Sequence, residues 1–336
     1  MSFSRLSRRI LTTTVTVALA APLLAACADE GGDQFSDHGD ALEQAVALPV
    51  DAARVNVADA GAGETRVLSY LDVDDERPDQ EVTVSVSDGF DQTVMRADAV
   101  DTQAPLDAHV DTLTLPLTGV AAPADEPLEG EQEATRDVTF RLSSPEASDL
   151  DLMEDLRTTD GFRFGWRAED TGQVSTVELA APEDASDEGR ALVEAAVMKV
   201  ISSPVIFPEE EIGVGAVWSV DSRVTGDSTM LRTTTYTVTA LDGDRVELDV
   251  DVQQRPALGA LSLEGVAGAE DLEEQSLSVL NSNTASEGAL TVDLTQPLPV
   301  DGELTFTTRV IYGGADDARI VQDTTTALEF SAGLDG

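Results

Sequence analysis

Short runs in which apolar and polar residues alternate recur along this chain from about residue 45 onward. Val82, Val84 and Val86, for example, are separated by Thr83 and Ser85. A period of two places every second side chain on the same face of a strand, so each run predicts a half-buried antiparallel strand. Similar runs predict strands near 113–117, 138–142, 231–240, 245–252, 276–280, 289–294, 303–312 and 320–330. The sequence therefore predicts a mainly β (α+β) fold of antiparallel sheets.

One principal helix is expected near residues 186–202. Its apolar positions follow the spacing i, i+4, i+7 and i+8, and they are Val193, Val197, Val200 and Ile201. This spacing places the four side chains on one side of a helix. Ser186 is a suitable N-cap, and Pro204 marks the end because proline cannot continue a helix. A single apolar stripe indicates that the helix buries one face.

The globular part is expected to cover residues 45–335, as one domain or as two lobes of about 45–185 and 204–335 joined by the helix. Residues 172–182 and 288–297 each begin with glycine, continue as a strand-like run and end in proline. This weak internal repetition favours two related lobes. A half-barrel with the helix across its mouth is the other arrangement that we expect.

The charge of the chain excludes one class of partner. Lysine and arginine total 20 against 65 aspartates and glutamates, which gives a formal net charge of −45. Such a surface repels phosphate backbones, so nucleic acid is excluded as a partner. One cysteine cannot form an intrachain disulfide, and one cysteine with two histidines cannot supply an ordinary structural zinc site. No cofactor is expected.

Residues 1–26 have the composition of a lipoprotein signal peptide. An uncharged, apolar or threonine-rich stretch over residues 10–26 follows a basic start formed by Arg5, Arg8 and Arg9. The stretch is followed directly by Cys27, within the sequence Leu24-Ala25-Ala26-Cys27. This ending resembles the bacterial lipobox, in which the cysteine thiol is diacylated before cleavage. Cys27 is therefore the predicted lipidation site.

Acyl chains on Cys27 would anchor the chain to the extracytoplasmic face of the bacterial cell membrane, which is the expected localisation. The membrane is accordingly an expected partner through these acyl chains. Residues 28–40 contain five aspartates and glutamates, three glycines and no lysine or arginine. Such a composition cannot bury enough apolar surface to fold. Residues 27–44 are therefore expected to form a lipidated acidic tether.

The run Pro208-Glu209-Glu210-Glu211-Ile212-Gly213-Val214-Gly215-Ala216-Val217-Trp218 combines a proline, acidic residues, two spaced glycines and a tryptophan. Together with the lipobox, the acidic tether and the segment 63–68, it resembles a family of uncharacterised actinobacterial lipoproteins. The resemblance covers most of residues 45–330. It implies a secreted, anchored, β-rich domain and transfers no catalytic residue, because the family has no established activity. From its position after a two-glycine turn, Trp218 is expected to be buried.

An aromatic row stands out in the first half of the chain. Phe162, Phe164 and Trp166 alternate with Arg163 and Gly165, so the three aromatic rings lie on one face of a strand. They are candidate residues for lining a ligand cavity. The alternative is an aromatic row that faces the core.

Residues that could carry catalysis are sparse. His109 is the one histidine within the predicted globular part, and the chain has no Gly-x-Ser-x-Gly motif. The acidic run that begins at Asp72 starts like a calcium loop, but Arg77 stands where an EF-hand loop needs glycine. We interpret this run as a solvated loop, and the sequence leaves calcium binding by acidic loops open. Neither catalytic residues nor metal ligands are assigned.

Two functional classes remain. The chain is expected to be an anchored envelope lipoprotein, not an enzyme, that binds an apolar or neutral envelope ligand. The alternative is a solid β scaffold that contacts other proteins at the membrane surface.

Replacing Cys27 with alanine should block acylation, because the chain has no other thiol. The measurement is incorporation of labelled palmitate by cells that express the chain with and without Cys27→Ala. Label on the variant protein would contradict the assignment of the lipidation site.

Overall fold

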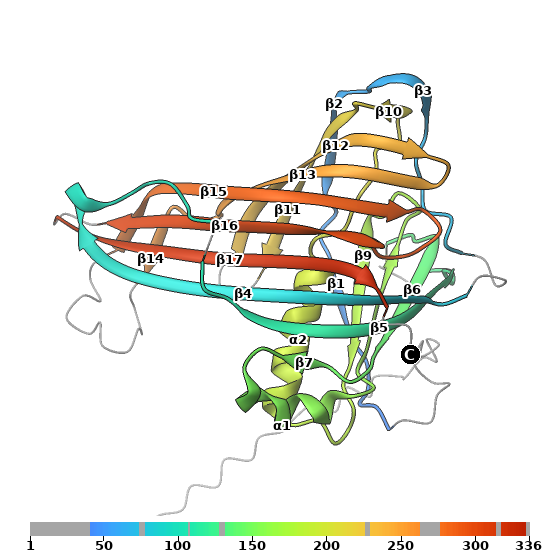
Figure 1. Ribbon diagram of the computed structural model, residues 1–336, viewed down its shortest axis with the longest axis horizontal. Coiled ribbons are helices and arrows are strands. Elements are labelled where there is room, and N and C mark those ends of the chain that lie inside the picture. The colour runs from blue at the N-terminus through green and yellow to red at the C-terminus, as the bar shows by residue number, and fades with distance from the viewer. Residues whose placement is uncertain are drawn as a thin grey trace, which may run out of the picture. The chain divides into compact units, whose positions relative to one another are not determined.

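The computed structural model describes residues 41–73, 78–106, 108–127, 132–225, 229–262, 276–313 and 317–333. All of them belong to one compact unit, Gln34–Gly336. Most lie in a single sheet of 15 described strands in which neighbouring strands pair antiparallel (Figure 1). The predicted mainly β, antiparallel fold is confirmed.

The strands follow one another across the main sheet in an order that departs from their order in the chain. From one edge to the other they are β1 (Val46–Pro49), β9 (Val174–Ala180), β8 (Arg163–Ala168), β6 (Arg136–Leu142), β5 (Asp111–Pro123), β4 (Gln80–Arg96), β17 (Ala318–Ala332), β16 (Asp301–Gly313), β15 (Ser276–Asp293), β13 (Arg245–Pro256), β12 (Thr229–Asp242), β11 (Val217–Thr225) and β2 (Arg54–Asp59). Two short strands are added beside this path, β7 (Glu146–Ala147) on β5 and β14 (Ala260–Ser262) on β15. A separate two-stranded sheet pairs β3 (Ala62–Arg66) with β10 (Ile212–Val214).

The two halves of the chain meet at the ladder between β4 and β17. This ladder runs from the pair Val82 and Ala332 to the pair Arg96 and Ala318 without a register shift. At one edge of the sheet, β2 from the N-terminal part pairs with β11 from the C-terminal part. The two predicted halves, about 45–185 and 204–335, are therefore joined edge to edge in one open sheet.

The principal helix, α2 (Asp187–Ile201), forms where the sequence predicts it. The Ser186 hydroxyl accepts a hydrogen bond from the Gly189 backbone N–H at 3.1 Å, which caps the first turn. The buried side of the helix carries the predicted stripe of Val193, Val197, Val200 and Ile201. Four shorter helical turns are also present, namely α1 (Met153–Leu156) and the 3₁₀ turns Ala97–Ala99, Leu150–Leu152 and Arg157–Thr159.

The sheet curves so that α2 lies against its concave face (Figure 1). Inward side chains from both halves of the sheet form one hydrophobic core with α2, among them Val84, Leu115, Phe140, Val177, Leu248, Val292 and Phe306. The edge strands β1 and β2 do not pair with each other, so the sheet stays open. This arrangement agrees with the half-barrel that the sequence allows.

The strands β13 and β15 form a seam that is joined in two different ways. Backbone pairing connects them from Arg245 to Asp249. Further along, the backbone N–H groups of Val252 and Gln254 donate instead to the hydroxyls of Ser286 and Thr284, both at 2.9 Å. The second part of the seam therefore depends on side chains rather than on a backbone ladder.

The described fold begins within the segment predicted as the tether. Leu42 forms an isolated antiparallel bridge with Pro182, and the Glu43 N–H donates to the Ala181 carbonyl at 2.9 Å. The Glu43 carboxylate also pairs with Arg190 of α2. Residues 41–44 thus pack against the globular part.

Trp218 is fully buried at the start of β11, as expected. Its indole Nε1–H donates to the Ile206 carbonyl at 2.8 Å, and its ring stacks on Tyr236 at a centroid distance of 5.2 Å. The preceding turn needs glycine, because Gly215 has a φ of +84° and a Cβ on Gly213 would lie 2.9 Å from the Glu64 carbonyl oxygen.

Trp218→Ala should lower the free energy of unfolding by about 3–5 kcal/mol, because it leaves a cavity and removes a buried hydrogen bond. Chemical denaturation of the full chain measures this change. Trp218→Phe, which keeps the ring stacking, is the control and should cost less. An unchanged midpoint for Trp218→Ala would contradict the structural role of this side chain.

Candidate functional site

The segment that leaves α2, Ser202–Phe207 (the exit segment), crosses the interior without joining a strand. Four of its backbone carbonyls accept hydrogen bonds from buried side chains instead. The pairs are Ser202 O with Arg232 Nη1 at 3.1 Å, Pro204 O with Tyr236 Oη at 2.9 Å, Val205 O with Tyr70 Oη at 3.3 Å and Ile206 O with Trp218 Nε1 at 2.8 Å. Buried carbonyls need such partners because water cannot reach them.

The aromatic donors form a continuous chain of rings. Tyr70 lies 5.8 Å from Phe207, Phe207 lies 5.9 Å from Trp218, and Trp218 lies 5.2 Å from Tyr236. Burial raises the pKa of Tyr70 and of Tyr236 well above the ordinary value for a phenol. Both hydroxyls therefore stay protonated and remain donors across the physiological pH range.

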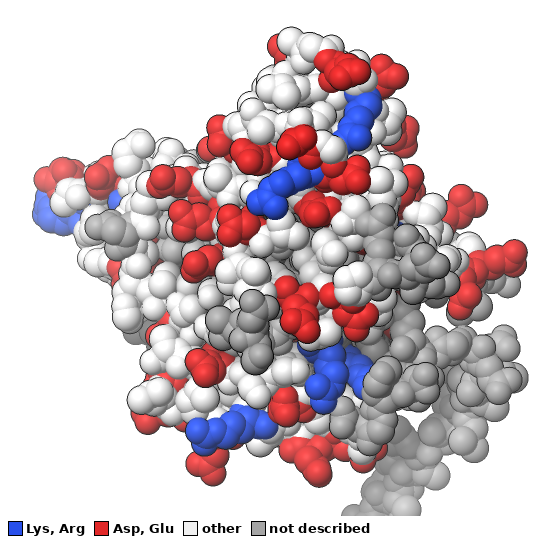
Figure 2. Space-filling view, turned by 45° about the vertical axis from the view of Figure 1, so that its right-hand side comes forward, with Lys and Arg blue, Asp and Glu red and all other residues white. Residues whose placement is uncertain are grey.

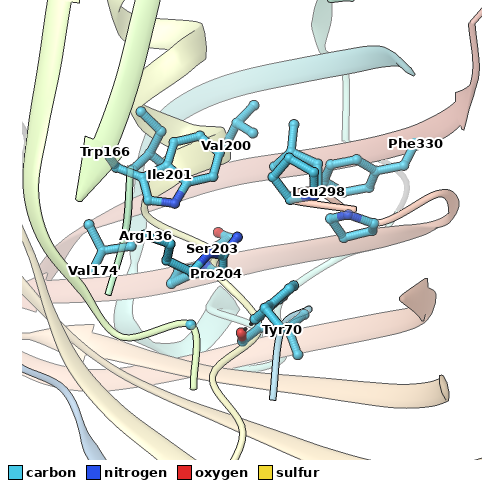
Figure 3. A pocket seen from close by; sticks show the side chains of 14 residues that line it. Tyr70, Arg136, Trp166, Val174, Val200, Ile201, Ser203, Pro204, Leu298 and Phe330 are labelled. Carbon is cyan, nitrogen blue, oxygen red and sulfur yellow. Dashed lines mark hydrogen bonds between the residues drawn. The ribbon is translucent and has the colours of Figure 1, made fainter. Parts of the chain in front are cut away.

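A small cavity lies between the exit segment and the sheet (Figure 3). Tyr70, Arg136 and Trp166 line it, with Pro204 on the exit segment and Leu298 on the opposite loop. Its volume is about 30 Å³. This is roughly the space of one water molecule, far below the ~300 Å³ of a small-molecule pocket. The cavity cannot hold a lipid in this conformation.

Arg136 and Asp72 form a buried ion pair beside this cavity, and both side chains are at most 2% exposed. The Arg136 guanidinium also lies 4.1 Å from the centroid of the Tyr70 ring. Asp72 therefore does not belong to a solvated loop, which corrects our interpretation of the run that begins there. The remaining acids of that run, residues 74–76, lie outside the described residues.

The predicted aromatic row lies in the core. Phe162 and Phe164 are fully buried, and Phe164 and Trp166 both stack on Phe140 at 5.6 and 5.7 Å. Of the three, Trp166 lines the small cavity. Substituting Phe162 or Phe164 would therefore disturb core packing directly. Whether the row lines a ligand site stays a prediction.

A row of polar side chains crosses the concave face where α2 ends. We call this row the polar belt, and it consists of Ser222, Arg232, Gln254, Thr284, Thr308 and Thr324. The polar belt lies beside the last turn of α2. In this turn Lys199 pairs at 3.2 Å with Asp88, which lies on β4 two residues before the row of the belt. The belt separates the core from the far ends of the long strands.

Arg232 is the cation of the polar belt. It is 7% exposed, and its guanidinium lies 5.0 Å from the centroid of the Phe306 ring on β16. Its Nε donates to Gln254 Oε1 at 3.0 Å, and its Nη1 donates to the Ser202 carbonyl and the Ser203 hydroxyl, both at 3.1 Å. Burial lowers the pKa of Arg232 to about 10. The side chain remains charged at neutral pH.

At the belt on β4 and beyond it on β16 and β17, the concave face carries apolar side chains with the polar pair Gln92 and Gln322 among them. We call this area the distal face, and its apolar residues are Phe90, which pairs with Thr324 of the belt, and Val94, Val310, Tyr312 and Ile320. Phe90 and Val94 share a face with Val84 and Val86 because the ladder between β4 and β17 has no register shift. Both are 66% exposed. Phe90 and Val94 are thus large apolar side chains in contact with solvent on the inward face, whereas Val310 and Tyr312 are 6% and 8% exposed.

On the face that Figure 2 shows, acidic side chains are spread widely and basic side chains are few. His109 is exposed in the connection between β4 and β5. Among the described residues, no group of three or more histidine, cysteine, aspartate or glutamate side chains is placed to hold a metal ion. No helix in the described part of the chain is long and apolar enough to cross a membrane. Cys27 and the signal segment lie outside the described residues.

Comparison with known proteins finds no matching protein-family model and no matching curated protein. The resemblance to actinobacterial lipoproteins therefore stays a prediction. The candidate site rests on the geometry of the polar belt and the distal face.

Sequence reasoning did not identify the residues of this site. The alternation that begins at Val82 ends at Val86, because Asp88 and Gln92 occupy the next in-phase positions on either side of Phe90, so the pattern does not mark Phe90 and Val94. Arg232 sits in a threonine-rich run with no motif around it. Only the strand register of β12 in the folded sheet places Arg232 beside the end of α2.

The free energy of unfolding should fall above about pH 10, because tyrosines in the unfolded chain ionise there while Tyr70 and Tyr236 stay protonated in the fold. The stabilisation that comes from the raised pKa values is complete below pH 10. It is lost as the pH rises towards the pKa values of the two tyrosines in the folded chain. Each group adds a slope of up to about 1.4 kcal/mol per pH unit.

Urea unfolding at pH 9, 10 and 11 measures this slope. The double variant Tyr70→Phe and Tyr236→Phe should lose most of it, although it is less stable at neutral pH. Tyr312→Phe is the control and should change the slope less, since burial raises the pKa of Tyr312 by a smaller amount. An equal slope in the parent and the double variant would show that these phenols ionise normally.

Proposed function

We propose that this chain is a membrane-anchored lipoprotein of the bacterial envelope and that its half-barrel is a binding module without catalytic activity. The ligand that fits this proposal is an apolar or neutral molecule of the envelope. The lipobox ending at Cys27 supports the anchor, and the resemblance to actinobacterial lipoproteins supports the location. The strongly acidic composition argues against nucleic acid as a partner.

The observation that carries the binding proposal is the exposure of Phe90 and Val94 on the concave face. Exposed single apolar residues are common, but these two lie on the inward side of a curved sheet. Val94 pairs with Ile320 and, one strand further, lies in line with Tyr312, whereas Phe90 pairs with Thr324 and the hydrogen-bonded Gln92 and Gln322 lie between the two. Exposed apolar side chains on the concave face of an otherwise acidic protein favour an apolar ligand.

One observation favours the solid scaffold instead. The cavity beside Arg136 is only about 30 Å³, so the core around α2 has no room for a ligand in this conformation. In this second proposal the apolar residues of the distal face contact another protein.

Native mass spectrometry of the full chain, extracted from membranes in a mild detergent, separates the two proposals. The binding proposal predicts a lipid or other apolar molecule that remains bound after the detergent is removed in the gas phase. A chain that is always free of such a molecule, even after incubation with total envelope lipid, would support the scaffold.

Phe90→Thr combined with Val94→Thr should abolish retention of the co-purified molecule. The free energy of unfolding should change little, since both side chains are mostly exposed and threonine suits a strand. Leu150→Ser, which removes an exposed leucine outside the sheet, is the matched control and should retain the ligand. Equal retention by both proteins would remove the distal face from the binding site.

A further inference from the structure

We propose that the half-barrel binds a free long-chain fatty acid, with the carboxylate at Arg232 and the hydrocarbon chain on the distal face. This inference rests on the proposed function, because the acyl chain is the apolar ligand of the same surface, and it departs from that function in giving the ligand one negative charge at Arg232. It is carried by the charge and hydrogen bonding of Arg232 and by the position of this residue on the concave face.

Arg232 differs in its partners from other buried or half-buried arginines of this fold. Arg136 pairs with Asp72, and Arg309 pairs with Asp323 through two hydrogen bonds of 2.8 and 2.6 Å. Arg232 forms no ion pair with a carboxylate within the described part of the chain. The chain has 65 acidic residues, and none of those that the structure describes pairs with this buried cation. A cation kept from water and from protein carboxylates is a suitable counterion for an anionic ligand.

The guanidinium still has a donor to offer. Nε and Nη1 are used by Gln254, Ser202 and Ser203, whereas Nη2 makes no hydrogen bond with the described residues. The carbonyl end of α2 offsets roughly half a unit of the arginine charge. The remaining charge and donor suit one carboxylate.

The geometry places an apolar chain beyond this carboxylate. Arg232 lies over Phe306, and Val310 follows four residues later on the same inward face of β16. At about 3.3 Å per residue, these two positions are about 13 Å apart. Thr308 lies between them and is 1% exposed, and Val310 and Tyr312 are 6% and 8% exposed. We place the extended acyl chain along this line, from Arg232 to the exposed Val94 and Phe90.

Titration of the full chain, held in amphipol, with cis-parinaric acid and with its methyl ester tests this inference. Both probes fluoresce in apolar surroundings, but only the acid carries a charge. The parent protein should bind the acid at least tenfold more tightly than the ester, as expected for a charge-assisted hydrogen bond. Arg232→Gln should lower the affinity for the acid to that for the ester and leave the ester unchanged. Arg223→Gln, an exposed arginine on the neighbouring strand, should alter neither affinity.

Each outcome decides the inference. Equal affinity of the parent protein for acid and ester would overturn the role of Arg232 while the binding proposal stands. This comparison needs no variant, so it remains valid if Arg232→Gln unfolds. Equal loss of both affinities in a folded Arg232→Gln protein would show that the arginine only supports the exit segment. No binding of either probe would overturn the proposed function and this inference with it.

Discussion

The interior of this protein depends on side-chain donors that serve the backbone of the exit segment. This segment lies inside a curved sheet, where no strand ladder is available to its carbonyls. Two tyrosines, a tryptophan and an arginine, from positions as distant in sequence as Tyr70 and Tyr236, supply the missing hydrogen bonds. The same donors connect β11 and β12 to the end of α2. The helix therefore keeps its place against the concave face through polar contacts as well as through its apolar stripe.

The fold class and the helix could be predicted from the sequence because both depend on local spacing. Period-two runs mark the strands, and Ser186 and Pro204 mark the helix limits. The order of strands could not be predicted in this way. The pairing of β4 with β17 joins residues more than 200 positions apart, and alternation states which face is buried but not which strand is adjacent. Which strands are neighbours in the sheet is thus determined by tertiary contacts between distant segments of the chain.

The candidate site was less accessible to sequence reasoning. The aromatic row of Phe162, Phe164 and Trp166 was a candidate because its large rings share one face, whereas the structure places all three in the core, with Trp166 also at the small cavity. Asp72 was grouped with the acids that follow it, yet its carboxylate lies against Arg136. Arg232 belongs to the site only because a helix from elsewhere ends beside it. A charge pattern along the chain cannot show which charges meet in space.

The seam between β13 and β15 has a consequence for how this sheet can move. Where a backbone ladder links two strands, separation breaks several amide bonds at once. Where Ser286 and Thr284 make the links, each hydroxyl can exchange its partner for water separately. The two sides of the half-barrel therefore spread apart most easily along this line, which adjoins the polar belt.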